Sequence, residues 1–128
     1  SGKMKTSLVT KALSMAYWRR KPGQGLIHHS DRGSQYAGCG YQNLLGVYGM
    51  ICSMSRKGNC WDNAVVESFF HSLKTEWTAD MLYRNRNDAR SDVISYIEMF
   101  YNSHRLHPYL EYKNPNDFEK SFMLAKAA

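Results

Sequence analysis

The chain of 128 residues predicts an α/β fold with short strands and a majority of helices. Two short apolar segments, residues 26–30 and 50–54, are separated by a stretch with helical spacing, and further helical stretches follow. A hydrophobic fraction of 43% is high enough for a folded core rather than a disordered chain. The length is typical of one domain, so we expect residues 1–128 to form a single domain.

The first predicted helix spans residues 4–20. Its apolar side chains recur at helical spacing, and three consecutive basic residues, Arg19 to Lys21, suit the negative end of the helix dipole. Pro22 and the glycine after it then end the helix.

A strand over residues 26–30 is expected to present Asp31 at its end. Because side chains alternate across a strand, His29 and Asp31 are predicted on one face and His28 on the other. Histidines on a short strand are usually packed or hydrogen-bonded, and Mg²⁺ prefers oxygen ligands, so we do not assign the two histidines to a metal.

The next elements are a helix over residues 41–49 and a strand over residues 50–54. Gly49 is placed to end the helix, since glycine commonly follows the last helical residue. Residues 55–61 contain glycine, asparagine and two cations, which is typical of a loop.

Three helices are predicted in the rest of the chain. Asp62 is expected to cap a helix that runs to about Trp77, and Asn87 a helix over residues 88–104. Asn114-Pro115 begins a last helix to about Ala125. The side chains expected to face inward are Val65 or Val66, Phe69 or Phe70, Leu73 and Trp77 in the first helix, and Ala89, Val93, Ile97, Phe100 and Tyr101 in the second.

The formal net charge of +6 indicates a polyanionic partner. Basic residues are interspersed with acidic ones, which favours a basic face over a basic tail. No segment approaches the roughly 20 apolar residues of a membrane span. The odd number of cysteines, without a Cys-x-x-Cys pair, predicts reduced thiols in the cytoplasm; a zinc site that combines Cys39, Cys52 or Cys60 with a histidine is the alternative.

Two strings of residues are distinctive: His28–Tyr36 (HHSDRGSQY) and Ser53–Ala64 (SMSRKGNCWDNA). Asp31 lies in the first, Glu67 lies just after the second, and Lys74 stands seven residues beyond the glutamate. These strings and their spacing resemble the second half of the DDE catalytic core of bacterial insertion-sequence transposases, specifically the long reading-frame product of the insertion-sequence-three family.

The resemblance runs from about residue 4 to the segment Asn114–Phe118 and implies a ribonuclease-H-like fold, the integrase core, represented by its C-terminal portion. No Asp or Glu precedes Asp31. The first of the family's three metal-binding carboxylates, and three antiparallel strands, are therefore expected upstream of Ser1. We expect the sheet edge exposed by their absence to favour a homo-oligomer.

The resemblance also implies the site. Asp31 and Glu67 are expected to be catalytic and to hold two Mg²⁺ or Mn²⁺ ions together with the missing carboxylate. Taken singly, an Asp before Arg-Gly is also typical of a turn, and a lone Glu or Lys of a solvated helix face. The residues expected to contact DNA are Lys74, His71 on the same helical stripe, and the loop residues Arg56, Lys57 and Asn59.

Some residues are expected to have structural roles. Tyr36, Tyr41 and Trp61 are able to stack on splayed bases, but packing is the better interpretation for each. Arg32 is able to pair with Asp31 instead of with DNA. The segment Tyr101–Tyr109 closes the helix predicted over residues 88–104 and is expected to be structural, with Arg105 as a possible contact to the DNA backbone.

The implied function is DNA cleavage and joining at the ends of a mobile element, with water and then a DNA 3′-hydroxyl as nucleophiles, in the bacterial cytoplasm and associated with the nucleoid. With two of three carboxylates, this chain alone is expected to bind metal weakly and to be inactive in strand transfer. The alternatives are a non-catalytic DNA-binding remnant, another ribonuclease-H-like nuclease or retroviral-type integrase, and a zinc-dependent structural protein.

Overall fold

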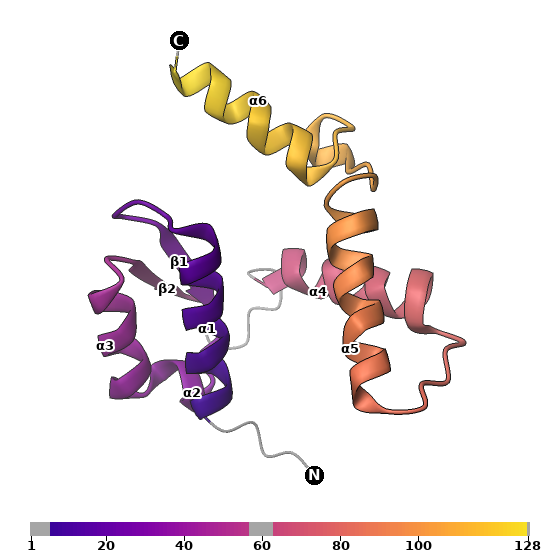
Figure 1. Cartoon of the computed structure of the whole chain (residues 1–128). Coiled ribbons are helices and arrows are strands. Elements are labelled where there is room, and N and C mark those ends of the chain that lie inside the picture. Colours follow the sequence, from indigo (N-terminus) through magenta and orange to yellow (C-terminus); the bar gives the residue numbers. More distant parts are fainter. Residues whose placement is uncertain (1–5, 57–62, 128) are drawn as a thin grey trace. The chain divides into compact units, whose positions relative to one another are not determined.

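The two predicted strands pair in parallel in the computed structural model, which describes residues 6–56 and 63–127 (Figure 1). Strand β1 (Ile27–Ser30) and strand β2 (Ile51–Met54) each begin one residue later than predicted. Ile27 lies opposite Ile51 and Ser30 opposite Met54, so the residues that follow both strands leave the sheet at the same edge.

The chain divides into two compact units, Ser1–Glu67 and Ser68–Ala128. The first contains the sheet, and the second is mainly helical, with an isolated antiparallel bridge between His107 and Lys113 (Figure 1). Helix α4 (Ala64–Ser72) runs through the boundary. Whether residues 1–128 behave as one domain stays a prediction.

Helices α1 (Thr6–Arg20) and α3 (Cys39–Val47) pack against each other in the first unit, with the short helix α2 (Ser34–Ala37) between them in the chain. Tyr17 stacks on Tyr48 with ring centroids 3.9 Å apart, which joins the ends of the two longer helices. The buried side chains of this core are Val9, Leu13, Tyr41 and Leu45.

The end of α3 confirms the prediction for Gly49. Its φ of +65° is a left-handed conformation that glycine adopts without strain. Its N–H donates to Gly46 and the N–H of Met50 donates to Leu45, the paired hydrogen bonds of a Schellman motif. Met50 packs on the core that includes Leu45, and the chain then enters β2.

Two α-helices, α4 and α5 (Arg86–Ser95), continue as π-helical segments. α4 continues as η2 (Leu73–Thr78), and α5 continues as η3 (Tyr96–Tyr101). The predicted helices therefore exist, but their last turns are wider than an α-helix. Figure 1 shows α5 crossing α4 at a steep angle.

An aromatic cluster joins these two helices. Tyr96 is completely buried, and its ring lies near those of Phe69, Trp77, Phe100 and Tyr101. The inward stripe of α4 and η2 was predicted correctly at Phe69, Leu73 and Trp77. The prediction for its first turn was wrong. Val65 and Val66 are exposed, since the partner rings of the cluster are reached only from Phe69 onward.

The prediction that Asn87 caps the α5 helix was also wrong. Asn85 is the cap, because its backbone is extended and its Oδ1 accepts hydrogen bonds from the N–H groups of Asn87 at 2.8 Å and Asp88 at 3.0 Å. The helix therefore begins at Arg86, and it ends with η3 rather than at residue 104.

A short 3₁₀ turn, η4 (Pro108–Leu110), leads to the last helix, α6 (Pro115–Ala127). Asn114 caps α6 as predicted by accepting the N–H of Asp117 at 2.9 Å. Asn116 joins the start of α6 to the residues after η3, since its N–H donates to the carbonyl of Asn102 at 3.0 Å.

Candidate active site

Asp31 directly follows β1 and is exposed. Its Oδ1 accepts the N–H of Gly33 at 2.8 Å, so the carboxylate shapes the turn that leads into α2. No described residue donates a hydrogen bond to Oδ2. The turn-forming role and a metal-binding role are thus compatible, because the turn occupies only one of the two carboxylate oxygens.

The two histidines before Asp31 lie on opposite faces of β1, as the alternation predicted. His28 is partly buried with Nε2 3.0 Å from the hydroxyl of Tyr41, whereas His29 is exposed with Nδ1 2.9 Å from the hydroxyl of Ser53. Burial lowers the pKa of His28, and burial raises the pKa of the Tyr41 phenol. Both histidines are hydrogen-bonded to neighbouring side chains.

Ser55 connects the ends of the two strands. It is buried, its N–H donates to the carbonyl of Ser30 at 2.9 Å, and its hydroxyl approaches the same carbonyl at 3.2 Å. The Nε of Arg32 donates to the carbonyl of Ser55 at 2.9 Å, and no ion pair between Arg32 and Asp31 exists in the described part of the chain. The Ser55 hydroxyl also lies 3.4 Å from Oδ1 of Asn63, the residue before α4.

Sequence reasoning missed Ser55. The signal available was its position: Ser55 follows β2 as Asp31 follows β1, and both strands end at the same edge of a parallel sheet. Through Ser55, the strand end that carries Asp31 is joined to the residue four positions before Glu67. Residues four apart on a helix share a face.

Glu67 lies in the first turn of α4, where a negative charge is favoured by the helix dipole. Its side chain is exposed, and no described residue forms an ion pair with it. Within residues 6–56 and 63–127, no three His, Cys, Asp or Glu side chains are grouped to hold a metal ion.

His71 and Lys74 are exposed on the same helical run as Glu67. The predicted helix is α-helical only to Ser72, and Lys74 lies in its π-helical continuation η2. Whether Glu67, His71 and Lys74 share one stripe stays a prediction. Arg56 is exposed; the predicted DNA contacts Lys57 and Asn59, together with Cys60, Trp61 and Asp62, lie outside the described residues.

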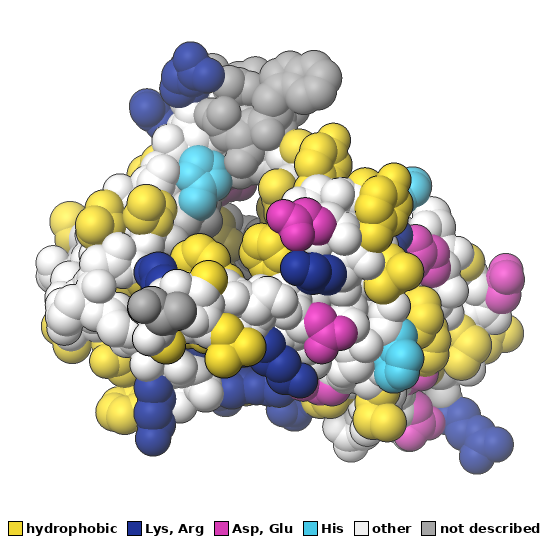
Figure 2. All heavy atoms as spheres, turned by 90° about the horizontal axis from the view of Figure 1, so that it is seen from above, with side chains coloured by type: hydrophobic (Ala, Val, Ile, Leu, Met, Phe, Trp, Pro, Cys, Tyr) yellow, Lys and Arg dark blue, Asp and Glu magenta, His cyan; other side chains and the backbone are white. Residues whose placement is uncertain are grey.

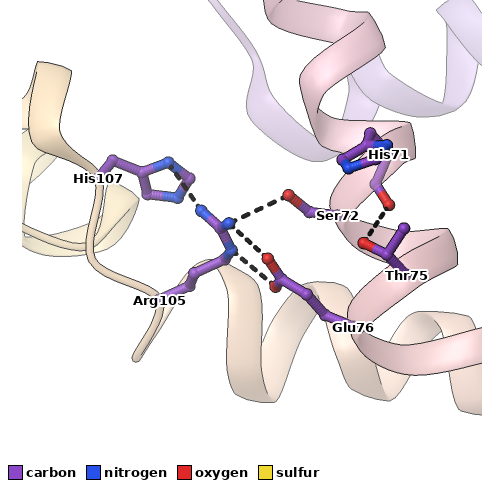
Figure 3. A network of polar contacts seen from close by, with 6 residues as sticks. All are labelled: His71, Ser72, Thr75, Glu76, Arg105 and His107. Atoms are coloured by element: carbon purple, nitrogen blue, oxygen red, sulfur yellow. Dashed lines mark hydrogen bonds and ion pairs between the residues drawn. The ribbon is translucent and has the colours of Figure 1, made fainter.

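Arg105 forms a dense polar network in the second unit. Its Nη2 lies 2.6 Å from Oε1 of Glu76 and its Nε 2.9 Å from Oε2, a bidentate ion pair. The same guanidinium donates to the Ser72 hydroxyl at 3.1 Å and approaches Nδ1 of His107 at 3.4 Å. Figure 3 shows the guanidinium between these three partners, with His71 apart from them and its carbonyl bonded to the hydroxyl of Thr75.

The network has the electrostatics expected of a structural ion pair. The hydrogen bond from Arg105 lowers the pKa of Glu76, and the bond to Glu76 raises the pKa of Arg105. Burial and then the charge of Arg105 lower the pKa of His107. The expected structural role of the segment Tyr101–Tyr109 agrees with this geometry, in which Arg105 bonds to Glu76 and Ser72.

Other predicted alternatives find a structural place. Tyr41 is buried, and the ring of Tyr36 lies edge-on to it at 5.3 Å, so both pack within the protein. Cys39 and Cys52 are exposed free thiols. Figure 2 shows Lys and Arg side chains at several separate places among hydrophobic and acidic ones. No helix within the described ranges combines the length and the apolarity needed to cross a lipid bilayer.

Comparisons with known proteins agree on one family. An integrase core domain family matches residues 48–115, and a second family described as integrase core domain matches residues 1–60. The transposase for insertion sequence element IS904 of Lactococcus lactis subsp. lactis is 44% identical over 120 residues, which are 94% of this chain and 47% of that protein.

Two further relatives give the same result. The insertion element IS600 uncharacterized 31 kDa protein of Shigella sonnei is 45% identical over 94% of this chain and 44% of its own length. Transposase InsF for insertion sequence IS3A of Escherichia coli is 44% identical over 93% of this chain and 41% of its own length. The chain therefore spans less than half the length of the curated relatives it matches. It belongs to the integrase core domain family and is similar to the transposases of IS3-type insertion sequences.

Proposed function

We propose that this chain is the part of a DNA transposase core that supplies two of the metal-binding carboxylates, Asp31 and Glu67. The observation that carries the proposal is the placement of Asp31, exposed at the end of β1 with one carboxylate oxygen unused by the turn, in a chain 44% identical to named transposases. The substrate would be the DNA at the ends of a mobile element and at its target.

The donor chemistry fits a divalent cation. Carboxylate oxygens are the ligands that Mg²⁺ and Mn²⁺ prefer, and Mg²⁺ needs only a few of them because it keeps several waters. When bound, divalent ions at this site would stabilise the negative charge that develops on a phosphodiester as it is cleaved. Asp31 and Glu67 would hold the ions, and the turn bond to Gly33 would keep the Asp31 carboxylate in one orientation.

Lys74 is proposed to bind a DNA phosphate near the cleaved bond. It is exposed, and no described acidic residue pairs with it, so its charge is available to a polyanion. Its place in a π-helical segment supports the proposal, since such turns are frequent at functional sites. Arg56, Lys57, Asn59 and His71 are the further proposed DNA contacts.

Metal binding tests the carboxylates. We would add Mn²⁺ to the chain, record paramagnetic broadening of the amide NMR signals, and repeat the titration with Asp31→Asn. Broadening centred on Asp31 and Glu67, lost in the variant, is the expected result. Broadening that is unchanged in the variant would contradict the proposal and leave a DNA-binding protein without a catalytic site.

DNA binding tests Lys74. Anisotropy of a labelled duplex, measured over a range of salt concentrations, should show that Lys74→Ala lowers the slope of log K against log salt by about 1, the value of one phosphate contact. Lys120→Ala is the control, because it removes another exposed lysine of the same unit, one that lies 3.9 Å from Oδ1 of Asp117. Equal losses in both variants would mean that only the net charge matters.

Three further expectations belong to this proposal. Two carboxylates support a metal site poorly, so we expect weak metal binding and no strand transfer from this chain alone. Magnesium-dependent strand transfer by the purified chain would contradict this. Self-association and a place in the bacterial cytoplasm, near the nucleoid, also stay predictions; light scattering on the purified chain would test the first.

A further inference from the structure

Arg105 holds the helical segment that carries Lys74. Ser72 and Glu76 lie two residues before and two residues after Lys74, and the Nη2 atom of Arg105 donates to both side chains, at 3.1 Å and 2.6 Å. One guanidinium therefore joins both sides of the turn in which Lys74 lies. Figure 3 shows this arrangement without Lys74 itself.

The segment that carries Lys74, η2, is of a type that a tertiary contact can stabilise. η2 is π-helical, and π-helical turns are rare and usually limited to a single turn within a helix. A bidentate pair between a guanidinium and a carboxylate fixes both distance and orientation. The Glu76–Arg105 pair is of this kind and spans 29 residues of sequence, so it is a tertiary restraint on η2.

Arg105 is itself fixed in place. Its backbone N–H donates to the carbonyl of Phe100 at 3.0 Å, and its guanidinium lies 5.8 Å from the centroid of the Tyr101 ring. Nε, Nη1 and Nη2 all have protein partners, namely Glu76, His107 and Ser72. These bonds use most of the five N–H donors of the side chain, which leaves little capacity for a phosphate.

We propose that Arg105 is a positioning residue that sets the orientation of η2 and thereby presents Lys74 to DNA, without contacting DNA itself. The inference rests on the proposed function, because it assigns Arg105 a role through Lys74. It replaces the direct contact to the DNA backbone that the sequence left open for Arg105.

Charge changes distinguish this role from simple electrostatics. Glu76→Gln removes a negative charge, so the overall field predicts tighter DNA binding. Loss of the Glu76–Arg105 ion pair, which we call the clamp on η2, predicts weaker DNA binding. The salt slope should then fall by about 1, as for loss of one phosphate contact. Glu111→Gln is the matched control, because it removes the same charge from the Glu111–Lys113 ion pair of the same unit.

Two variants keep the net charge constant. Arg105→Lys keeps the cation but loses the bidentate geometry, and should lower the salt slope as Glu76→Gln does. The double variant Glu76→Arg with Arg105→Glu exchanges the partners and should restore the slope. If Arg105→Lys weakens binding and the exchange does not restore it, Arg105 contacts DNA directly and the proposal is wrong.

A double-mutant cycle and hydrogen exchange complete the test. In a Lys74→Ala background, Arg105→Lys should have no further effect on the salt slope, because the two residues act through one contact.

Hydrogen exchange tests the restraint on η2 directly. Amide exchange of residues 73–78 should accelerate in Arg105→Lys and in Glu76→Gln but not in Glu111→Gln. Unchanged exchange in all three variants would contradict the proposal that Arg105 restrains η2. If Lys74→Ala leaves DNA binding intact in the unmodified chain, the proposed function fails at Lys74, while the exchange measurement still decides whether the clamp exists.

Discussion

Asp31 in the first unit and Glu76 in the second are acidic side chains that differ in their hydrogen-bond partners. The carboxylate of Asp31 accepts one backbone N–H and is otherwise exposed, whereas that of Glu76 accepts two hydrogen bonds from Arg105. Asp31 is therefore available to a cation from solution, and the charge of Glu76 is already neutralised by the protein. The hydrogen-bond partners of a carboxylate, rather than its residue type, therefore distinguish a candidate metal ligand from a structural ion pair.

The two units also differ in their cores and in the polar groups beside those cores. The first unit packs aliphatic side chains and tyrosines from helices α1 and α3, beside a strand end with an exposed carboxylate. In the second unit, the aromatic cluster around Tyr96 and the polar network of Arg105 both join the α4–η2 run to the region of η3. We therefore expect substitutions in the second unit to have their main effect on the free energy of unfolding.

The largest effect is expected from Tyr96→Ala. Removing a completely buried aromatic side chain at the centre of a cluster should lower the free energy of unfolding by about 3–5 kcal/mol. Urea unfolding followed by NMR would measure it, and the signals of the second unit should be lost first. Loss of both sets of signals at one urea concentration would instead indicate a single cooperative domain.

Tyr96→Phe is its control. The buried hydroxyl of Tyr96 has no hydrogen-bond partner among the described residues, so removing it should leave stability unchanged or slightly higher. A loss as large as that of Tyr96→Ala would show that the hydroxyl, rather than the ring, is the stabilising group.

The second largest effect concerns Glu76 and pH. The hydrogen bond from Arg105 lowers the pKa of Glu76 in the folded state. The contribution of Glu76 to stability is therefore fully present at pH values above its ordinary pKa of 4.5 and is lost as pH falls through the folded pKa. Glu76→Gln should cost about 1 kcal/mol at pH 7, because the pair is partly exposed and screened. The difference in unfolding free energy between the unmodified chain and the variant should shrink below pH 4.5; a constant difference down to pH 2 would contradict the linkage.

Ser55→Ala is expected to act more locally. It removes a hydroxyl whose hydrogen bonds are worth about 1 kcal/mol, and the first turn of α4 should exchange its amide hydrogens faster. Ser53→Ala is the matched control, since its hydroxyl bonds His29 across the sheet and not Asn63. Equal acceleration in both variants would argue against a link from Ser55 to the helix that carries Glu67.

The smallest effect is expected at His28. Burial lowers its pKa in the folded state, so the unfolded chain binds the proton more readily as pH falls below the ordinary value of 6.5. Stability should then decline with falling pH, and His28→Gln should reduce that decline, as measured by urea unfolding at pH 7 and pH 5. His29→Gln, on the exposed face of the same strand, is the control; an identical reduction would exclude a role of burial.

The sequence by itself determined the features that depend on local spacing. Alternation along residues 26–30 placed His28 on the face opposite to His29 and Asp31, and Gly49 marked the end of a helix because a positive φ suits glycine. Helical periodicity found Leu73 and Trp77 as inward residues and left Phe69 and Phe70 as alternatives, of which Phe69 is the inward one. Such rules use only neighbours within one or two turns of the chain.

Only the tertiary structure decided the rest. Tyr96 became the centre of a core because rings from another helix surround it, and Ser55 became a connector because β1 and β2 pair in one register. The ion pair between Glu76 and Arg105 joins residues 29 positions apart, which no periodicity reveals. These interactions depend on which elements meet in space, so side chains that look alike in the sequence acquire different roles once the chain has folded.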